Sequence, residues 1–381
     1  MSVLRGLNWW PNLQMMTPDT RGNNNPLPPS FAGKRVLITG GTGSLGKTLA
    51  RRFLGGSADS PAKIIILSRD EAKQHLMRIE YQHKRAATDE IIYRNFQEKL
   101  EFRIGDVRDI HSVTQALRDV DLVFNAAALK QVPTCEYFPY EAVRTNIEGP
   151  ENIIRAIQEH ALPIETVVGI STDKACKPVD VMGMTKAIQE RVFIQANIRC
   201  PKTRFVCVRY GNVLASRGSV IPLFHDQIRN GGPLTITTPE MTRFLLSLND
   251  AVDVIFAAVR SGSAGDTYIP RVPSAQVTHI AKALIGDRPI ETKFVGIRPG
   301  EKVHEILVSD EEAHRTVERG GYYVIRPMLP ELRDVKKESP CLAKEYSSSD
   351  NVMSLEETNR LLKSQGLMPE DISDESVEVL R

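Results

Sequence analysis

The chain has 381 residues, of which 41% are hydrophobic and 25% charged, a composition typical of globular proteins with a sizeable core. Lysine plus arginine total 49 against 47 for aspartate plus glutamate, so the net charge of +2 provides no overall field for nucleic acid or an anionic membrane. The five cysteines form no C-x-x-C pair and no metal-ligand cluster. The sequence therefore predicts neither a metal site nor a disulfide framework, and it favours a reducing, cytoplasmic location.

Segment 1–33 is expected to be an N-terminal extension. It contains Trp9, Trp10 and a polar, proline-rich run, but no basic-then-apolar signal sequence. No stretch of the chain approaches the roughly 20 apolar residues that a membrane helix needs. We therefore predict a soluble protein without membrane insertion.

From residue 34, short β-branched runs alternate with segments of helical periodicity, which predicts an α/β fold with a doubly wound parallel Rossmann sheet. Leu45, Leu49 and Phe53 recur at i, i+4 and i+8 and form the expected buried stripe of the first helix. The expected strands are 35–39, 64–67, 100–104, 122–125, 166–170 and 205–208.

After residue 210, glycine and proline interrupt the pattern, and helices are expected near 249–259, 277–284 and 354–364. We interpret these segments as a smaller C-terminal substrate-binding domain interleaved with the last elements of the sheet. The expected division is a Rossmann domain over 34–210 and 242–270, a substrate domain over 211–241 and 271–330, and a tail over 331–381.

A glycine-rich loop separates the first expected strand from the first helix. Gly40, Gly43 and Gly46 follow a G-x-x-G-x-x-G spacing, which suits a tight turn, a close approach to pyrophosphate and free N–H groups at a helix N-terminus. The loop predicts a dinucleotide site, and a structural turn is the alternative. Its other candidate members are Thr42, Ser44 and Leu45.

The ends of the next strands supply further candidates for the cofactor crevice. Ser68, Arg69 and Asp70 lie where an adenosine ribose is expected. Arg69 can bind a 2′-phosphate, so it favours NADP as the cofactor, and NAD is the alternative. The competing interpretation of Arg69 is a solvated arginine that caps the loop. Further candidates at strand ends are Asp106, Val107, Ala126, Ala127 and Ala128.

The fifth expected strand ends in a cluster that suits proton transfer. Ser171, Thr172, Asp173 and Lys174 place hydroxyls, an acid and a lysine at the edge of the crevice, where burial and opposite charge tune pKa values. Met182 and Lys186 follow, four residues apart on one helix face. A surface ion pair is the alternative interpretation of Asp173 and Lys174.

Taken in order, several blocks resemble one family, and the resemblance covers about Lys34 to Leu307. The blocks are Thr39–Gly46, Ser68–Glu71, Gly105–Asp109, Ala126–Lys130, Ser171–Ala175, Arg209–Val213, Ser216–Val220, Met241–Phe244 and Arg298–Lys302. Together they resemble the bacterial UDP-N-acetylglucosamine 4,6-dehydratases of capsule, flagellin-glycan and lipopolysaccharide sugar pathways, which are extended short-chain dehydrogenases/reductases.

The resemblance implies an internal redox dehydration with a tightly bound, recycled NADP or NAD and no metal. Hydride leaves C4 of the sugar, water is eliminated across C5 and C6, and hydride returns at C6. By resemblance, Asp173 protonates the departing C6 hydroxyl and Lys174 takes the C5 proton. Thr172 hydrogen-bonds the C4 oxygen, and Lys186 holds the nicotinamide ribose.

The resemblance also implies binding roles for residues outside the loop and the acid–base cluster. The added cofactor-binding candidates are Asn146, Ser171, Tyr210 and Asn212. The substrate-binding candidates are Lys130, Asn212, Arg217, Ser219, Thr242, Arg243, Arg298 and Glu301. The arginines would supply the local positive charge that UDP requires.

Met182 departs from the superfamily pattern. Members usually carry tyrosine in a Tyr-x-x-x-Lys motif, where the phenolate accepts the C4 hydroxyl proton, and methionine cannot do so. A branch of the dehydratase family resembles this chain in carrying methionine. The C4 proton then needs another acceptor, and Asp173, Thr172 with water, and Lys186 all stay open.

Two other functions compete with the dehydratase interpretation. The same fold and substrate suit a C4 epimerase or a 5,6-dehydratase. A cofactor-binding regulatory protein that senses NADP is the alternative from another class, but a binding module needs no acid–base pair such as Asp173 and Lys174. By resemblance, we also expect a homo-oligomer, a dimer or hexamer, formed through helices near 141–159 and 185–198.

Overall fold

The structure is a computed structural model that describes residues 31–55, 59–82, 95–214, 219–298, 300–333 and 338–371. Most of the expected N-terminal extension, including Trp9 and Trp10, lies outside these residues, as does the candidate Arg217. No helix in the described part of the chain is long and apolar enough to cross a membrane.

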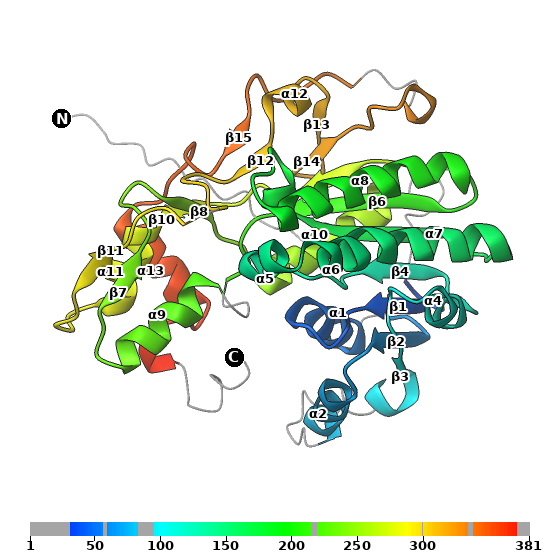
Figure 1. Ribbon diagram of the computed structural model, residues 1–381, viewed down its shortest axis with the longest axis horizontal. Coiled ribbons are helices and arrows are strands. Elements are labelled where there is room, and N and C mark those ends of the chain that lie inside the picture. The colour runs from blue at the N-terminus through cyan, green and yellow to red at the C-terminus, as the bar shows by residue number, and fades with distance from the viewer. Residues whose placement is uncertain are drawn as a thin grey trace, which may run out of the picture.

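A nine-stranded sheet forms the centre of the molecule, in the order β13-β14-β9-β6-β5-β4-β1-β2-β3 (Figure 1). The strands from β3 to β9 are parallel, and β14 and β13 complete the sheet in antiparallel pairing. Their bounds are β1 Arg35–Thr39, β2 Lys63–Ser68, β3 Leu100–Ile104, β4 Leu122–Asn125, β5 Thr166–Thr172, β6 Arg204–Tyr210, β9 Thr267–Ile269, β13 Thr316–Arg319 and β14 Tyr322–Ile325. The predicted doubly wound sheet is confirmed.

Helices cover both faces of this sheet. Residues of α1 (Ser44–Leu54), α2 (Glu71–Gln82) and α10 (Leu248–Ser261) join one core, and residues of α4 (Ile110–Leu117), α7 (Gly149–His160) and α8 (Val181–Arg199) join the other. In β1, Val36 and Ile38 face the first core and Leu37 faces the second. A strand buried on both faces reads as a continuous apolar run, which made these strands recognisable in the sequence.

A smaller lobe packs at one side of the large sheet, away from α4 and α7 (Figure 1). Its core contains Phe224, Leu284 and Leu362. These residues come from α9 (Val220–Arg229), α11 (Val277–Ile285) and α13 (Leu355–Ser364). The helices predicted near 249–259, 277–284 and 354–364 are confirmed as α10, α11 and α13.

Three short strand pairs lie outside the large sheet. They are β7 (Leu234–Ile236) with β11 (Thr292–Phe294), of which β7 contributes to the core of the smaller lobe, β8 (Thr242–Phe244) with β10 (Ser274–Gln276), and β12 (Ile306–Val308) with β15 (Tyr346–Ser347). The remaining helices are α5 (Val132–Tyr137) and α6 (Pro139–Val143), followed by a π-helical turn (Arg144–Glu148), and α12 (Asp310–Ala313).

The chain crosses between the two parts more often than the sequence suggests. The hairpin of β13 and β14 comes from segment 271–330 but extends the large sheet, whereas β8 pairs with β10 outside it. An antiparallel hairpin lacks the strand–helix alternation that marks a Rossmann unit. At these two segments the structure departs from the expected division into domains, and the rest of that division stays a prediction.

Candidate active site

The carboxyl ends of the parallel strands surround a cavity of about 530 Å³. The loops after β1, β4, β5 and β6 and the first turns of α8 line it, which is where ligands bind in open α/β sheets. The predicted site residues that line the cavity are Gly40, Thr42, Gly43, Ser44, Leu45, Gly46, Ala126, Ala127, Ala128, Lys130, Ser171, Thr172, Asp173, Lys174, Met182, Lys186, Tyr210, Asn212 and Ser219.

The glycine-rich loop has the backbone geometry that a phosphate group requires. Gly40 has φ of +64°, and a Cβ there would lie 2.8 Å from Cα of Ala127, so only glycine fits. Gly43 precedes α1, and no described side chain caps the helix N-terminus. The first turn of α1 therefore presents N–H groups and a positive dipole end to the cavity.

The tip of β2 lies beyond the lining of the cavity. Thr42 Oγ1 lies 3.0 Å from Ser68 Oγ and joins the loop to β2, while Asp70 pairs with Lys73 at 2.7 Å. The exposed Arg69 lies 3.8 Å from Asp106. Its guanidinium can therefore reach solvent or a ligand.

Asp106 and Val107 follow β3 and also lie outside the lining. Burial opposes ionisation of Asp106, but hydrogen bonds from Arg108 lower its pKa overall, so it is a carboxylate beside Arg69. The side chain of Val107 is buried in the second core, and its carbonyl accepts from Asn152 at 3.0 Å. We infer that both residues shape the edge of the crevice.

Asn146 is fully buried, and its amide group is occupied by protein partners. Its Oδ1 accepts from Leu129 N at 2.8 Å, and its Nδ2 donates to Leu129 O at 2.9 Å and to Thr185 Oγ1 at 3.0 Å. Asn146 therefore positions the segment after β4 against α8, and acts on the cavity through that segment.

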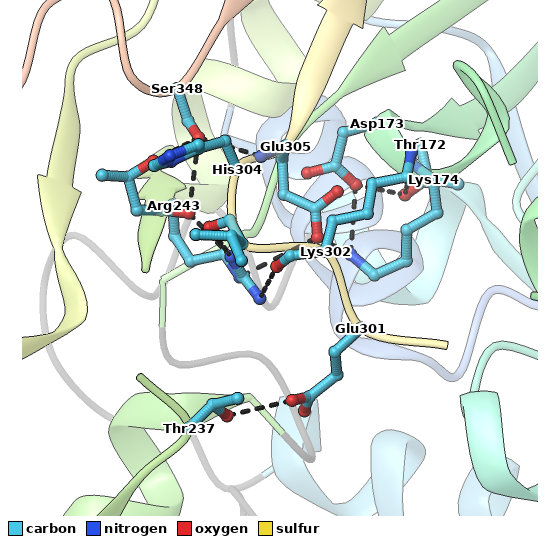
Figure 2. Close-up of polar contacts among 12 residues, drawn as sticks. Thr172, Asp173, Lys174, Thr237, Arg243, Glu301, Lys302, His304, Glu305 and Ser348 are labelled. Carbon is cyan, nitrogen blue, oxygen red and sulfur yellow. Dashed lines mark hydrogen bonds and ion pairs between the residues drawn. The ribbon is translucent and has the colours of Figure 1, made fainter. Parts of the chain in front are cut away.

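The side chains of the predicted acid–base cluster at the end of β5 lie close together (Figure 2). Asp173 Oδ1 accepts from Thr172 Oγ1 at 2.9 Å and from Lys174 Nζ at 3.2 Å. Lys174 Nζ also lies 3.4 Å from Glu305 Oε1, which in turn lies 3.8 Å from Nε of Arg243. The interpretation of Asp173 and Lys174 as a surface ion pair is therefore wrong, because the Asp173 side chain is only 1% exposed.

Burial and charge set the protonation of this cluster. Burial raises the pKa of Asp173; Lys174 opposes that rise and Glu305 adds to it, leaving the pKa raised. Burial alone would lower the pKa of Lys174, but the carboxylates of Asp173 and Glu305 raise it overall. The pKa of Glu305 is lowered despite its burial, because Lys174 and Arg243 stabilise its charge.

Lys186 and Met182 lie on the first turns of α8. Lys186 Nζ donates to Ile170 O and, at 2.6 Å, to Gln189 Oε1, and burial lowers its pKa to about 8. Met182 is buried and contributes an apolar wall. A Cβ at Gly183 would lie 2.3 Å from Lys174 O, so glycine lets the start of α8 pack against the acid–base pair.

Three buried polar atoms of lining residues lack a hydrogen-bond partner among the described residues. They are Asp173 Oδ2, Asn212 Oδ1 and Ser219 Oγ. A buried polar atom without a partner costs free energy unless a ligand or water satisfies it. Together with the Gly40 turn and the N-terminus of α1, these atoms fit a polar ligand such as a dinucleotide and its substrate.

The other substrate candidates lie outside the cavity lining, although they gather near it. Thr242 Oγ1 contacts His304 Nδ1 at 2.8 Å and borders a second hollow of about 800 Å³ in the smaller lobe. Glu301 accepts from Thr237 Oγ1 at 2.9 Å (Figure 2), and Arg298 is exposed next to it. Their roles in binding a substrate stay predictions.

The structure also brings in residues that sequence reasoning missed. Glu305 contacts Lys174, and Ser348 Oγ accepts from the Glu305 backbone N–H at 2.9 Å. Glu190 on α8 accepts from Ser171 Oγ at 2.5 Å and pairs with Arg209. The available signal for Glu305 was an acidic residue three positions after the Arg298–Lys302 block, directly before an apolar strand.

Within the described ranges, no group of His, Cys, Asp and Glu side chains could hold a metal ion. The strand order, the glycine-rich loop after β1, the cavity at the strand ends and a lysine on the first turns of α8 define a class of protein. The fold is the Rossmann fold of the extended short-chain dehydrogenases/reductases.

The chain belongs to the polysaccharide biosynthesis protein family, whose model matches residues 36–327. It is 42% identical over 355 residues to a protein named UDP-glucose 4-epimerase from Rickettsia typhi, covering 90% of this chain and 99% of that one. A Rickettsia bellii protein of the same name is also 42% identical, over 356 residues.

Among solved structures, Pen from Bacillus thuringiensis is similar with a TM-score of 0.79 and 33% identity, covering 89% of this chain and 99% of that one. DesIV, a dTDP-glucose 4,6-dehydratase from Streptomyces venezuelae with NAD and TYD bound, is similar in fold, with a TM-score of 0.59 and 21% identity. The similarity to DesIV covers 71% of this chain and 86% of the DesIV chain.

Proposed function

We propose that the protein is a UDP-N-acetylglucosamine 4,6-dehydratase that depends on NADP or NAD. The buried Asp173–Lys174 pair carries this proposal, because it lies in the same cavity as the glycine-rich loop. Elimination of water needs an acid and a base at one site. When bound, the nicotinamide cofactor would accept hydride from C4 of the sugar and return it at C6.

Asp173 is the proposed acid for the C6 hydroxyl. Its raised pKa favours the protonated form, and its Oδ2 has no partner among the described residues. Thr172 Oγ1 holds the other oxygen at 2.9 Å, which fixes the orientation of the carboxyl group. A proton moves from Asp173 to the C6 oxygen as the C6–O bond breaks, and water leaves.

Lys174 is the proposed acceptor of the C5 proton. Its raised pKa makes it an ammonium held between the carboxyl groups of Asp173 and Glu305. It becomes an acceptor only when one of its protons moves to a neighbouring carboxylate. Lys186 holds the nicotinamide ribose, and its pKa of about 8 lets it donate a hydrogen bond as a cation near neutral pH.

Arg69 supports NADP as the cofactor. Its guanidinium lies at the tip of β2, 3.8 Å from Asp106, where the 2′ position of an adenosine ribose is expected. The ion pair with Asp106 orients it without enclosing it. A 2′-phosphate can therefore form charge-assisted hydrogen bonds with Arg69.

A UDP-sugar 4-epimerase is the second candidate, favoured by the names of the Rickettsia relatives. Epimerisation needs hydride transfer at C4 and one acceptor for the C4 hydroxyl proton. It uses neither an acid for a leaving hydroxyl nor a base at C5, so it gives a role to at most one member of the Asp173–Lys174 pair, as acceptor of the C4 hydroxyl proton. The pair therefore favours dehydration.

The test is incubation of the purified protein and UDP-N-acetylglucosamine in deuterated water, followed by mass analysis. Loss of water with one deuterium at C5 is expected for the 4,6-dehydratase. A chromatographically separable epimer of unchanged mass indicates an epimerase, and loss of water without deuterium indicates a 5,6-dehydratase. The Asp173→Asn variant is expected to bind the cofactor but to show no turnover. The control variant Asp287→Asn, at an exposed position, is expected to retain both cofactor binding and turnover. A fully active Asp173→Asn enzyme contradicts the assignment.

We also propose a homo-oligomer formed through one apolar face. Large apolar side chains are exposed on α8 and on the neighbouring segment that carries α5 and α6: Tyr137, Phe138, Tyr140, Met184, Ile188 and Ile198. Large exposed apolar patches mark protein interfaces, and α5 and α6 both pack against α8. Light scattering is expected to give a mass above that of one chain, and Ile188→Glu is expected to reduce it.

A further inference from the structure

The Asp173–Lys174 pair has a third charged member, Glu305. It directly precedes β12, far from β5 along the chain, yet its Oε1 lies 3.4 Å from Lys174 Nζ. Asp173 Oδ1 lies 3.2 Å from the same nitrogen. Figure 2 shows the lysine reaching both carboxylates.

Both carboxylates are almost completely removed from water. The side chains of Asp173 and Glu305 are 1% and 3% exposed. Asp173 Oδ2 and Glu305 Oε2 are buried without a hydrogen-bond partner among the described residues. Burial disfavours the charged form of each carboxyl group, and two ionised carboxylates in so dry a volume also repel each other, so the protonated form of one of them is favoured.

The surrounding charges decide which carboxylate stays ionised. Around Glu305 lie Lys174 at 3.4 Å, Arg243 at 3.8 Å from β8, and Lys302 from its own segment. Among the described residues, the charged groups that act on Asp173 are the Lys174 cation and the Glu305 anion. The charge therefore settles on Glu305 and the proton on Asp173.

Other titratable groups near the cluster come from α8 and β6. Asp180, directly before α8, interacts electrostatically with Lys174 and Glu305, and burial raises its pKa. Lys186 points to Ile170 O, and burial raises the pKa of Tyr210 well above its ordinary value. Near neutral pH, Tyr210 is uncharged and Lys186 is bound to the end of β5, so neither replaces Glu305 as the anion beside Lys174.

The proposed elimination also requires an acceptor for the proton that Lys174 must release. Its ammonium contacts two carboxylates among the described residues, Asp173 and Glu305. Asp173 must already carry a proton to act as the acid. Glu305 is then the carboxylate left to accept one.

We propose that Glu305 is a positioning residue of this acid–base pair: it keeps the proton on Asp173 and receives the proton that Lys174 releases. An Nζ–H bond of Lys174 breaks and an Oε1–H bond forms on Glu305. The freed Nζ electron pair takes the C5 proton, the C5–H electrons form the C5–C6 double bond, and the C6 hydroxyl leaves as water with the Asp173 proton. This inference rests on the proposed dehydration.

Infrared spectroscopy tests the charge effect without any turnover. The experiment follows the carbonyl stretch of a protonated carboxylic acid against pH in the full-length protein. The band that is lost in the Asp173→Asn variant is assigned to Asp173. In Glu305→Gln the repulsion is gone, so the Asp173 band is expected to disappear at lower pH. Glu305→Asp retains the charge and is expected to titrate close to wild type, as is the exposed control Glu318→Gln.

Kinetics test the proton transfer. Glu305→Gln is expected to lower kcat about 10²-fold with little change in KM, within the range typical of general acid–base catalysis. The alkaline limb of its pH profile is expected to move to lower pH, because Asp173 loses its proton earlier. Glu305→Asp is expected to restore most of the rate.

Unchanged infrared titration and an unchanged pH profile in a folded Glu305→Gln variant overturn the proposal. A uniform loss of kcat in both Glu305 variants with the pH profile of wild type also overturns it, since that result indicates only structural support. If the wild type eliminates no water but its Asp173 band still depends on Glu305, the proposed function fails while the charge effect of Glu305 stands.

Discussion

Glu312 stabilises the fold through a buried guanidinium, and the size of that effect follows from its pKa. Arg209 Nη1 lies 2.7 Å from Glu312 and its Nη2 lies 2.7 Å from Glu190, with the Arg209 side chain 3% exposed. Burial would raise the pKa of Glu312, but Arg209 overcomes it and lowers the pKa from 4.5 to about 2. At about 1.4 kcal/mol per tenfold change, this is worth roughly 3 kcal/mol of stability.

The sign of the pH dependence is fixed by this lowered pKa. The stabilisation is fully present above the unfolded pKa of 4.5 and is lost as pH falls toward about 2. Glu312→Gln keeps the shape but removes the charge, so it is expected to lower the free energy of unfolding by roughly 3 kcal/mol at about pH 7. At about pH 3 the difference is expected to shrink to about 1.4 kcal/mol.

Urea denaturation of wild type, Glu312→Gln and Glu311→Gln at both pH values measures these differences. Glu311 is the exposed neighbour on the same helix and is expected to change stability little. A Glu312→Gln variant that is equally destabilised at both pH values refutes the electrostatic reasoning. An equal cost for Glu311→Gln refutes it too.

Three further variants test the cofactor loop, the choice of cofactor and the missing tyrosine. In Gly40→Ala the new Cβ collides with the Ala127 backbone at a strained φ, so the variant is expected to lower the free energy of unfolding by about 1–3 kcal/mol and to abolish nucleotide binding in calorimetry. The control Gly55→Ala, whose Cβ has room, is expected to do neither. Tight nucleotide binding to Gly40→Ala contradicts this prediction. Arg69→Ala is expected to weaken NADP binding at least about tenfold relative to NAD, and an unchanged ratio argues against the role of Arg69. Met182→Leu replaces one apolar side chain that transfers no proton by another. It is therefore expected to lower the free energy of unfolding by less than about 1.5 kcal/mol and to retain turnover. A large loss of kcat would assign a chemical role to the thioether.

Local patterns made the Rossmann sheet predictable from the sequence. Strands such as β1 are buried on both faces and appear as short apolar runs between helical segments. The glycine-rich loop and the run Ser171–Lys174 are each a continuous stretch of sequence that directly follows an apolar run, so the sequence pattern alone placed both at strand ends. The hairpin of β13 and β14 joins the sheet without a helical crossover, and no local pattern indicates such a long-range pairing.

The contacts that tune the acid–base pair were not predictable, because they depend on tertiary structure. Glu305 reaches Lys174 from a loop more than a hundred positions away in the sequence, and an isolated acidic residue before a strand carries no signal of its partner. The raised pKa of Asp173 depends first on burial, which a composition or spacing pattern does not give.

Ser348, directly after β15, joins Glu305 to the segment that carries this strand. Its N–H donates to Glu305 O at 2.8 Å, its Oγ accepts from Glu305 N, and the same Oγ lies 2.6 Å from Thr242 Oγ1. A ribosome makes the strands β1 to β6 long before it reaches Ser348, and N-terminal units fold first during synthesis. A nascent chain can therefore form the glycine-rich loop while Glu305 still lacks its hydrogen bonds to Ser348, so the contacts around Lys174 are completed only after Ser348 has been synthesised.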